Sequence, residues 1–330
     1  MIPQTFARAP RAVALGLSLA LATSLGACNI AGTSPAPSAD VTRPLLVATT
    51  RAPAADPGAS PFFGTERGAG LAFAQATLAP PGDGLFTSLS PFDVDWTVVG
   101  VGPVVTAEPA QAFARAAVGR DVLVYVHGYR ETFETAASGA AELADGIGFR
   151  GATGLFTWPS GGATFDYGYD RESALWSRDA LEELILTLAQ SESGGRVHVV
   201  AHSMGSLLTL ETLRFVRASG GDAAMARIGA VVLASPDVDI DLFAQGVERL
   251  GVDARKITVI TAQNDRALAL SRRLAGGVVR AGAADRERLT GLGVTVADAS
   301  EFGSGVLNHD LFLRDPDVRS VVARAVERAP

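Results

Sequence analysis

Hydrophobic and polar positions follow two different periods along this chain. Short apolar runs, several of them rich in β-branched residues, alternate with segments in which apolar residues recur every three or four positions. The first pattern predicts buried strands, and the second predicts amphipathic helices. We expect strands within 45–50, 62–84, 96–101, 121–126, 153–158, 196–201, 228–234, 256–262 and 294–297. We expect helices within about 132–148, 171–190, 206–216, 242–250, 266–274 and 316–327.

Strands that alternate with helices predict right-handed crossovers and a mostly parallel central sheet. Such a sheet carries helices on both faces, so the expected fold class is α/β. The long helix at 171–190 is expected to turn five apolar side chains inward: Leu175, Leu181, Leu184, Ile185 and Leu188. No internal repeat is present, and one hydrophobic pattern runs from residue 45 onward. We therefore interpret 44–330 as a single α/β domain.

The stretch Arg196–Leu210, RVHVVAHSMGSLLTL, joins a predicted strand to a predicted helix. At the corner lies the pentapeptide Ala-His-Ser-Met-Gly, in which small residues, Ala201 and Gly205, flank Ser203. This is the layout of a nucleophile elbow, a sharp turn that lifts a serine hydroxyl above the sheet. The alternative is a plain strand–turn–helix that happens to contain a serine. The strand-to-helix context favours the elbow.

A serine hydroxyl needs a base to become a nucleophile, and four histidines are candidates. His198 lies in mid-strand, His202 directly precedes the serine with its side chain on the other face, and His127 ends an earlier strand. His309 lies in a late loop, where the chain order Ser…Asp…His requires the base. By this elimination we predict His309 as the general base.

The acid that fixes the base has two possible origins. Asp265 follows the second strand after the elbow, at the carboxyl end where working residues gather in parallel sheets. Asp237 and Asp239 follow the strand directly after the elbow, but either can instead cap the next helix. We predict Asp265, with Asp237 or Asp239 as the alternative.

An oxyanion hole needs two N–H donors aimed at the developing negative charge. The backbone N–H of Met204, directly after the serine, is the first by elbow geometry. We expect the second in the loop after strand 121–126, past His127-Gly128, and assign it to the backbone of Tyr129. The alternative for this tripeptide is an ordinary turn that ends a strand.

Composition narrows the possible partners. Lysine and arginine number 28 against 35 aspartates and glutamates, giving a net charge of −7 without a basic cluster. Nucleic acid is therefore not an expected partner. No predicted helix carries a His-x-x-x-His pair, and the sequence has no Gly-x-Gly-x-x-Gly and no Walker spacing, so we expect neither a metal nor a nucleotide cofactor.

The N-terminus carries a targeting pattern. Arg8 and Arg11 precede the uncharged apolar run Ala12–Ala27, which is short for a membrane span, so we expect residues 1–27 to be a signal peptide. The run ends in Leu-Gly-Ala-Cys, which resembles a bacterial lipoprotein box and implies that Cys28 is lipidated. The alternative is a plain secretory signal with an unmodified Cys28.

The segment 28–43 is rich in proline, serine and alanine and lacks periodicity, so it is expected to tether the domain to the lipid anchor. Cys28 is the single cysteine, so no intrachain disulfide forms. These features predict an exported, lipid-anchored protein of the cell envelope, at the outer membrane, with its domain facing the periplasm.

Seven segments resemble the DUF900 group of bacterial alpha/beta hydrolases, which are esterase- or lipase-like. They are VATTRA (47–52), VLVYVHGY (122–129), FTWPSGG (156–162), AHSMGS (201–206), LASPDVD (233–239), TAQNDRAL (261–268) and NHDLFLRDP (308–316). The resemblance implies the alpha/beta-hydrolase fold, with Ser203, Asp265 and His309 at the triad positions and Tyr129 near the oxyanion hole. Ala201 departs from the first glycine of the superfamily motif.

The expected function is hydrolysis of a small-molecule or lipid carboxylic ester through an acyl-enzyme on Ser203. Two alternatives stay open at this point. One is a catalytically silent envelope lipoprotein that uses the fold for binding. The other is a triad enzyme that acts on amide or thioester bonds.

Overall fold

One nine-stranded sheet organises the described part of the chain, with the strand order β3-β2-β1-β5-β4-β6-β7-β8-β9. The computed structural model describes residues 42–329 apart from 57, 59, 82–94, 105–107, 163–165, 192–194 and 303–307. The described residues belong to one compact unit, Pro37–Pro330. The strands are β1 (Arg43–Pro53), β2 (Phe63–Ala79), β3 (Thr97–Pro103), β4 (Val122–Val126), β5 (Ala152–Thr157), β6 (Val197–His202), β7 (Ile228–Ala234), β8 (Ile257–Thr261) and β9 (Thr295–Asp298).

Strand directions follow the predicted pattern. Only the pairs β1–β2 and β2–β3 among the described strands are antiparallel, and all other neighbours are parallel. The carboxyl ends of β4 to β8 therefore meet at one edge of the sheet, where α/β folds gather their working residues. The predicted fold class, a mostly parallel sheet between helices, is confirmed.

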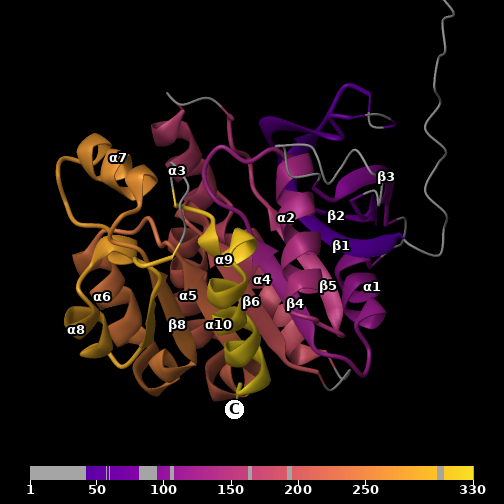
Figure 1. Ribbon diagram of the computed structural model, residues 1–330. Helices are drawn as coiled ribbons and strands as arrows, with labels where there is room; N and C mark the ends of the chain where they lie inside the picture. Colours follow the sequence, from indigo (N-terminus) through magenta and orange to yellow (C-terminus); the bar gives the residue numbers. More distant parts are fainter. Residues whose placement is uncertain are drawn as a thin grey trace, which may run out of the picture. The chain divides into compact units, whose positions relative to one another are not determined.

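Helices cover both faces of the sheet (Figure 1). They are α1 (Pro109–Ala116), α2 (Phe133–Gly146), α3 (Tyr167–Trp176), α4 (Arg178–Gln190), α5 (Met204–Arg227), α6 (Ile240–Leu250), α7 (Arg266–Leu274), α8 (Arg286–Thr290), α9 (Leu311–Arg314) and α10 (Pro316–Glu327), with short 3₁₀ turns at Gly251–Lys256 and Ala281–Ala283. Side chains of α2, α9 and α10 pack on one face, and those of α1, α3, α4, α5, α6 and α8 pack on the other.

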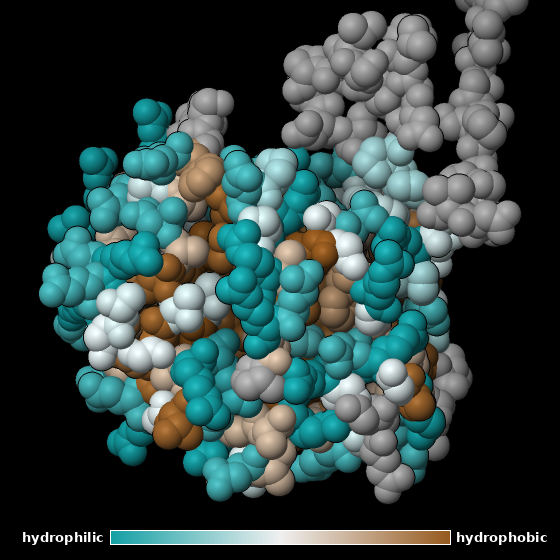
Figure 2. Space-filling model, turned by 60° about the horizontal axis from the view of Figure 1, so that its bottom comes forward, coloured by the Kyte–Doolittle hydropathy of each residue, from teal (hydrophilic) through white to brown (hydrophobic). Residues whose placement is uncertain are grey.

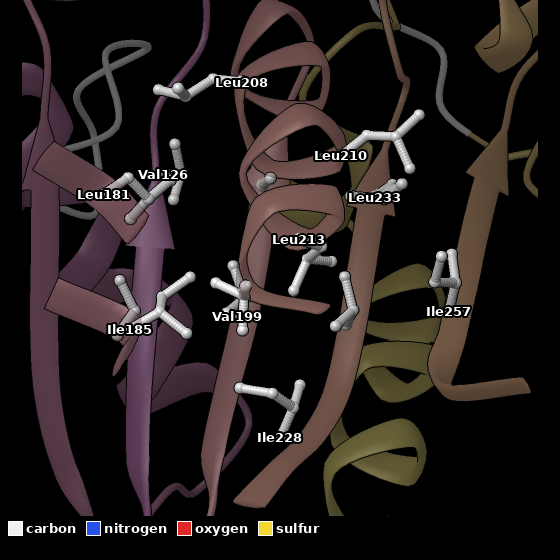
Figure 3. Packing of buried hydrophobic residues seen from close by; sticks show 14 of the residues in the cluster. Val126, Leu181, Ile185, Val199, Leu208, Leu210, Leu213, Ile228, Leu233 and Ile257 are labelled. Carbon is white, nitrogen blue, oxygen red and sulfur yellow. The ribbon is translucent and has the colours of Figure 1, made fainter. Parts of the chain in front are cut away.

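The core explains why the strands read as continuous apolar runs. Parallel strands covered on both faces bury every side chain, and β4 and β7 are buried at all their positions. Figure 3 shows Leu181 and Ile185 of α4 and Leu213 of α5 pointing toward the strands. Fully burying each such side chain contributes about 1.5–3 kcal/mol. This packing holds α5, and with it the corner at Ser203, firmly against the sheet.

The prediction of one helix over 171–190 is wrong. Two helices, α3 and α4, meet at Ser177, whose buried hydroxyl donates to the Ser173 carbonyl and lies 2.8 Å from the Thr50 hydroxyl on β1. This anchor to β1 fixes the junction. Leu175, expected to point inward, is 37% exposed, whereas the other four predicted positions are buried. Helix α1 was not predicted; its eight residues make only about two helical turns, too few for the window of about 11–18 residues over which a helical period is recognised.

The face of the molecule drawn in Figure 2 is largely polar. In the space-filling view of one side, hydrophilic residues cover most of the face, and apolar residues are visible mainly between them (Figure 2). None of the described helices is both long enough and apolar enough to cross a bilayer.

Candidate active site

Ser203 lies at the corner between β6 and α5 in a strained backbone conformation. Its φ of 51° and ψ of −119° fall outside the helical and strand regions, and a non-glycine residue rarely adopts a positive φ. The surrounding hydrogen bonds hold the turn: the Ser203 N–H donates to Ala234 O at 2.9 Å, and the Ser206 N–H donates to Ser203 O at 3.0 Å. Strain of this kind persists only where the structure over-determines it, as at functional sites.

Gly205 is the residue that the sharp corner requires. A Cβ at this position would lie 2.3 Å from His127 O and 2.7 Å from Val126 O, so the start of α5 passes too close to the end of β4 for any side chain. Ala201, which replaces the first glycine of the superfamily motif, is a regular β6 residue paired with Leu233 and Val126. Its methyl group is buried without conflict, so a glycine is not needed there.

His309 and Asp265 are brought together although 44 residues separate them. The distance from His309 Nδ1 to Asp265 Oδ2 is 2.6 Å, a short charge-assisted hydrogen bond. The Asp265 side chain is completely buried, and that of His309 is 17% exposed. Asp265 Oδ1 accepts the Leu268 N–H at 3.0 Å and so caps α7. With one carboxylate oxygen on the helix and the other on the imidazole, Asp265 orients His309 and keeps its proton on Nδ1.

The imidazole Nε2 of His309 is thereby left as a hydrogen-bond acceptor. Among the described residues no hydrogen bond joins Ser203 Oγ to His309. Catalytic hydrogen bonds are often loose without substrate and tighten in the complex. An unprotonated Nε2 can accept a proton from a hydroxyl group that comes within hydrogen-bond distance.

The alternative acids are engaged elsewhere. Asp237 is buried, accepts hydrogen bonds from Tyr167 Oη at 3.1 Å and Ser271 Oγ at 2.5 Å, and lies 3.1 Å from Arg280 Nε. Asp239 caps α6 by accepting the N–H groups of residues 241 and 242. Asp265 is thus the one of the three candidates whose carboxylate meets His309.

His198, which lies inside β6 as its predicted mid-strand position implies, accepts the Ala230 N–H at 3.1 Å and is 1% exposed. His202 has a role that the sequence did not reveal. Its Nε2 donates to the carbonyl of His309 at 3.1 Å, and the two rings lie 4.6 Å apart. Burial, helped by the neighbouring His309, holds the pKa of His202 well below 6.5. A neutral His202 therefore supports the backbone of His309.

The loop after β4 approaches the elbow very closely. A Cβ on Gly128 would lie 3.0 Å from Ser203 Cβ and 2.9 Å from His202 Nδ1, so only glycine fits without displacement. This contact brings the backbone of 128–129 next to the serine, where a second oxyanion donor is needed. Met204 is the first residue of α5, whose leading N–H groups have no partner within the helix.

Within the described ranges no group of three or more His, Cys, Asp or Glu side chains is arranged to hold a metal ion. The predicted signal peptide, Cys28 and most of the tether lie outside the described residues.

Two kinds of similarity to known proteins accompany this geometry. An uncharacterized protein of Nostoc sp. is 40% identical over 58 residues, which cover 18% of this chain and 15% of that protein's length. Among solved structures, Aspergillus fumigatus lipase B has a TM-score of 0.40 and 15% identity over 76% of this chain and 62% of its own. An esterase of Pyrobaculum calidifontis has a TM-score of 0.39 and 15% identity, covering 87% and 84%. The catalytic core of an acetyl xylan esterase from Trichoderma reesei has a TM-score of 0.37 and 12% identity, covering 62% and 97%.

A family model matches a much larger part of the chain. It spans residues 108–326, from the start of α1 almost to the end of α10, and describes an alpha/beta hydrolase of unknown function. The chain therefore belongs to the DUF900 family of alpha/beta hydrolases.

Proposed function

We propose that this alpha/beta hydrolase is a serine esterase that cleaves carboxylic esters through an acyl-enzyme on Ser203. The observation that carries the proposal is the 2.6 Å hydrogen bond between Asp265 Oδ2 and His309 Nδ1, at the same sheet edge as Ser203. An aspartate that keeps the proton on Nδ1 leaves Nε2 free to act as a base. The elbow at Ser203 supplies the nucleophile that such a base activates.

In the proposed reaction, His309 Nε2 takes the proton of Ser203 Oγ while the oxygen attacks the ester carbonyl. The buried Asp265 carboxylate stabilises the imidazolium that forms. The tetrahedral intermediate collapses when His309 returns the proton to the leaving alcohol. Water, activated by the same imidazole, then hydrolyses the acyl-enzyme and regenerates the serine.

The oxyanion of each intermediate is proposed to accept hydrogen bonds from the backbone N–H groups of Met204 and Tyr129. Gly128 supports this assignment, because its close approach to Ser203 brings the following peptide alongside the nucleophile. Losing one such donor typically lowers kcat about 100- to 1,000-fold.

Labelling with a fluorophosphonate probe, followed by peptide mapping, tests the nucleophile. We expect one labelled serine, Ser203, and no labelling of Ser203→Ala. Ser235→Ala is the matched control, because Ser235 also ends a strand with a positive φ, of 45°, and is buried. An unlabelled folded protein would favour the silent binding role and reject the enzyme.

A series of p-nitrophenyl esters of increasing acyl length, compared with matched amide and thioester substrates, tests the bond type. We expect turnover of esters, with the preferred length separating small-molecule from lipid esters. Turnover of amides or thioesters alone would replace the esterase proposal by the other triad chemistry.

We also propose that the protein is exported and held at the envelope by a lipid on Cys28, with its domain in the periplasm. The support is the sequence Leu-Gly-Ala-Cys after an apolar run. Mass spectrometry of the mature N-terminus is expected to find an acylated Cys28. An unmodified Cys28 would indicate a plain secretory signal.

A further inference from the structure

A buried arginine on β1 connects to the loop that follows β4. Arg51 is 2% exposed and donates from Nε to Thr157 Oγ1 at 2.8 Å and from Nη2 to Glu131 O at 2.6 Å. Its Nη1 donates to Gly64 O at 3.1 Å. Burial lowers the pKa of Arg51 to about 10, so the guanidinium stays charged at neutral pH. A buried charge of this kind is tolerated only when hydrogen bonds compensate it, and here they all end on backbone or hydroxyl oxygens.

Thr157, at the end of β5, forms hydrogen bonds with both Arg51 and His127. Because Thr157 Oγ1 accepts the Arg51 Nε–H, its own proton is available for His127 Nε2, which lies 3.1 Å away. The backbone N–H of Trp158 also donates to His127 Nε2, at 3.1 Å. A backbone N–H can only donate, so Nε2 must be unprotonated. The network thus selects one tautomer of His127, with its proton on Nδ1.

The proton on His127 Nδ1 has one partner, the carbonyl oxygen of Gly128 at 2.9 Å. On the other side of the residue, Trp158 Nε1 donates to the carbonyl of His127 at 3.0 Å, and the two rings stack at 4.8 Å. Burial, reinforced by the positive charge of Arg51, holds the pKa of His127 well below 6.5. The imidazole is therefore neutral, and it is fully used in hydrogen bonds.

Fixing the Gly128 carbonyl also fixes the N–H of Tyr129. The Gly128–Tyr129 peptide is trans, so its C=O and N–H point in opposite directions. With the carbonyl turned to the His127 ring, the Tyr129 N–H points away from that ring. A half-rotation of this peptide would replace the donor by a carbonyl oxygen, which would repel an oxyanion.

We infer that Arg51, Thr157 and His127 form a relay of positioning residues that holds the Tyr129 N–H in the orientation needed to stabilise an oxyanion on a substrate attacked by Ser203. This inference rests on the proposed function, since it refines the same site. None of the three side chains touches the substrate. They act through the orientation of one peptide plane.

Thr157→Val tests the relay, because valine keeps the shape of threonine but can neither accept from Arg51 nor donate to His127. Thr209→Val is the matched control: Thr209 is fully buried on α5, and its hydroxyl has no hydrogen-bond partner among the described residues. Thr157→Ser restores the hydroxyl and serves as the conservative rescue. The readouts are kcat and KM for a p-nitrophenyl ester and the Ki of a trifluoromethyl ketone, which forms an oxyanion adduct with an active serine.

We expect Thr157→Val to lower kcat about 10- to 100-fold, less than the loss of a whole oxyanion donor, and to change KM less than about threefold. The ketone Ki should rise by the same factor as kcat/KM falls, while Thr157→Ser and Thr209→Val stay close to the parent. Equal kcat and Ki in Thr157→Val and Thr209→Val, with parent protein active, would overturn the relay alone.

An independent readout separates the relay from the esterase proposal. Imidazole ¹⁵N shifts of His127 in the inactive Ser203→Ala protein are expected to report a neutral ring with its proton on Nδ1. In Thr157→Val the Nε2 resonance of His127 is expected to shift, because Nε2 loses the Thr157 donor and keeps only the Trp158 N–H. A His127 protonated on Nε2 in Ser203→Ala would contradict the relay whatever the activity of the parent. If the parent shows no labelling of Ser203, the proposed function fails, and the positioning role fails with it.

Discussion

Replacing Asp265 by asparagine separates the two roles of its carboxylate, capping helix α7 and orienting His309. Oδ1 caps α7 through the Leu268 N–H at 3.0 Å, and Oδ2 accepts His309 Nδ1–H at 2.6 Å. Asparagine is as good a helix cap as aspartate, so the folded state should lose only a few tenths of a kcal/mol. The second position, however, changes from an acceptor to an NH₂ donor that faces another donor. His309 must then carry its proton on Nε2, where it can no longer act as a base.

The expected loss of kcat in Asp265→Asn has two causes: His309 is in the wrong tautomer, and its imidazolium is no longer stabilised by a carboxylate. Such a change at a triad acid lowers kcat about 10⁴-fold, which corresponds to about 5.5 kcal/mol of activation free energy at about 1.36 kcal/mol per decade. Ester hydrolysis at saturating substrate measures kcat, and thermal melting confirms that Asp265→Asn is folded. Because Ser203 and the oxyanion donors are untouched, KM should change little.

Asp239→Asn provides the matched control, since Asp239 caps α6 through the N–H groups of Asp241 and Leu242 without contacting His309. The same chemical change at a second helix cap should leave kcat within about twofold, because only the cap is altered. If Asp265→Asn kept a tenth or more of the parent kcat, or if Asp239→Asn were the silencing change, the assignment of the acid would be wrong.

Three further predictions concern the frame around the site. Gly205→Ala is expected to lower stability by at least about 1–3 kcal/mol in chemical denaturation, because its Cβ would lie 2.3 Å from His127 O; an unchanged denaturation midpoint would contradict this packing. Asp237→Asn weakens a buried pair with Arg280 and should destabilise the fold by up to about 3–5 kcal/mol while the folded fraction keeps its kcat, which titration with an active-site probe can separate. Burial holds the pKa of His127 and His202 well below 6.5, so unfolding takes up protons at acidic pH. These two neutral histidines therefore cost no stability above about pH 6.5. Below that pH the free energy of unfolding falls by up to about 1.4 kcal/mol per pH unit for each histidine. Urea denaturation at several pH values between about 7.5 and 5.5 measures this fall.

The sequence was sufficient to predict the parts of the site that depend on strand order. Ser203 and Asp265 each follow a buried strand, and the carboxyl ends of parallel strands meet at one edge, so their proximity could be expected. His309 was found by elimination, and the structure brings its ring to the Asp265 carboxylate. The family pattern gave the same three positions.

What could not be predicted depends on contacts between residues far apart in the chain. The tautomer of His127 is set by Thr157 and Trp158, at the end of the neighbouring strand β5. The sequence around His127 gives no sign of these two contacts. The engagement of Asp237 depends on Arg280, 43 positions later, which pairs with it in the buried interior. The break at Ser177 likewise depends on β1, since its hydroxyl contacts Thr50. Periodicity predicts which face of a helix or strand is buried. It does not predict which polar side chains from other elements pair with the polar residues of that helix or strand.

Two neighbouring strands are each followed by a serine with a positive φ, and comparing them identifies what makes one serine a candidate nucleophile. Ser203 follows β6 with a φ of 51°, and Ser235 follows β7 with a φ of 45°. Strain is therefore not the distinguishing feature. The residue after a nucleophile must supply an N–H to the oxyanion, and Ser235 is followed by Pro236, which has none. Ser203 is followed by Met204, whose N–H opens helix α5 and lies at its positive end. Only the first of these two turns combines a hydroxyl with a following N–H that could serve as an oxyanion donor, so the backbone after the serine, more than the serine itself, supports Ser203 as the proposed nucleophile.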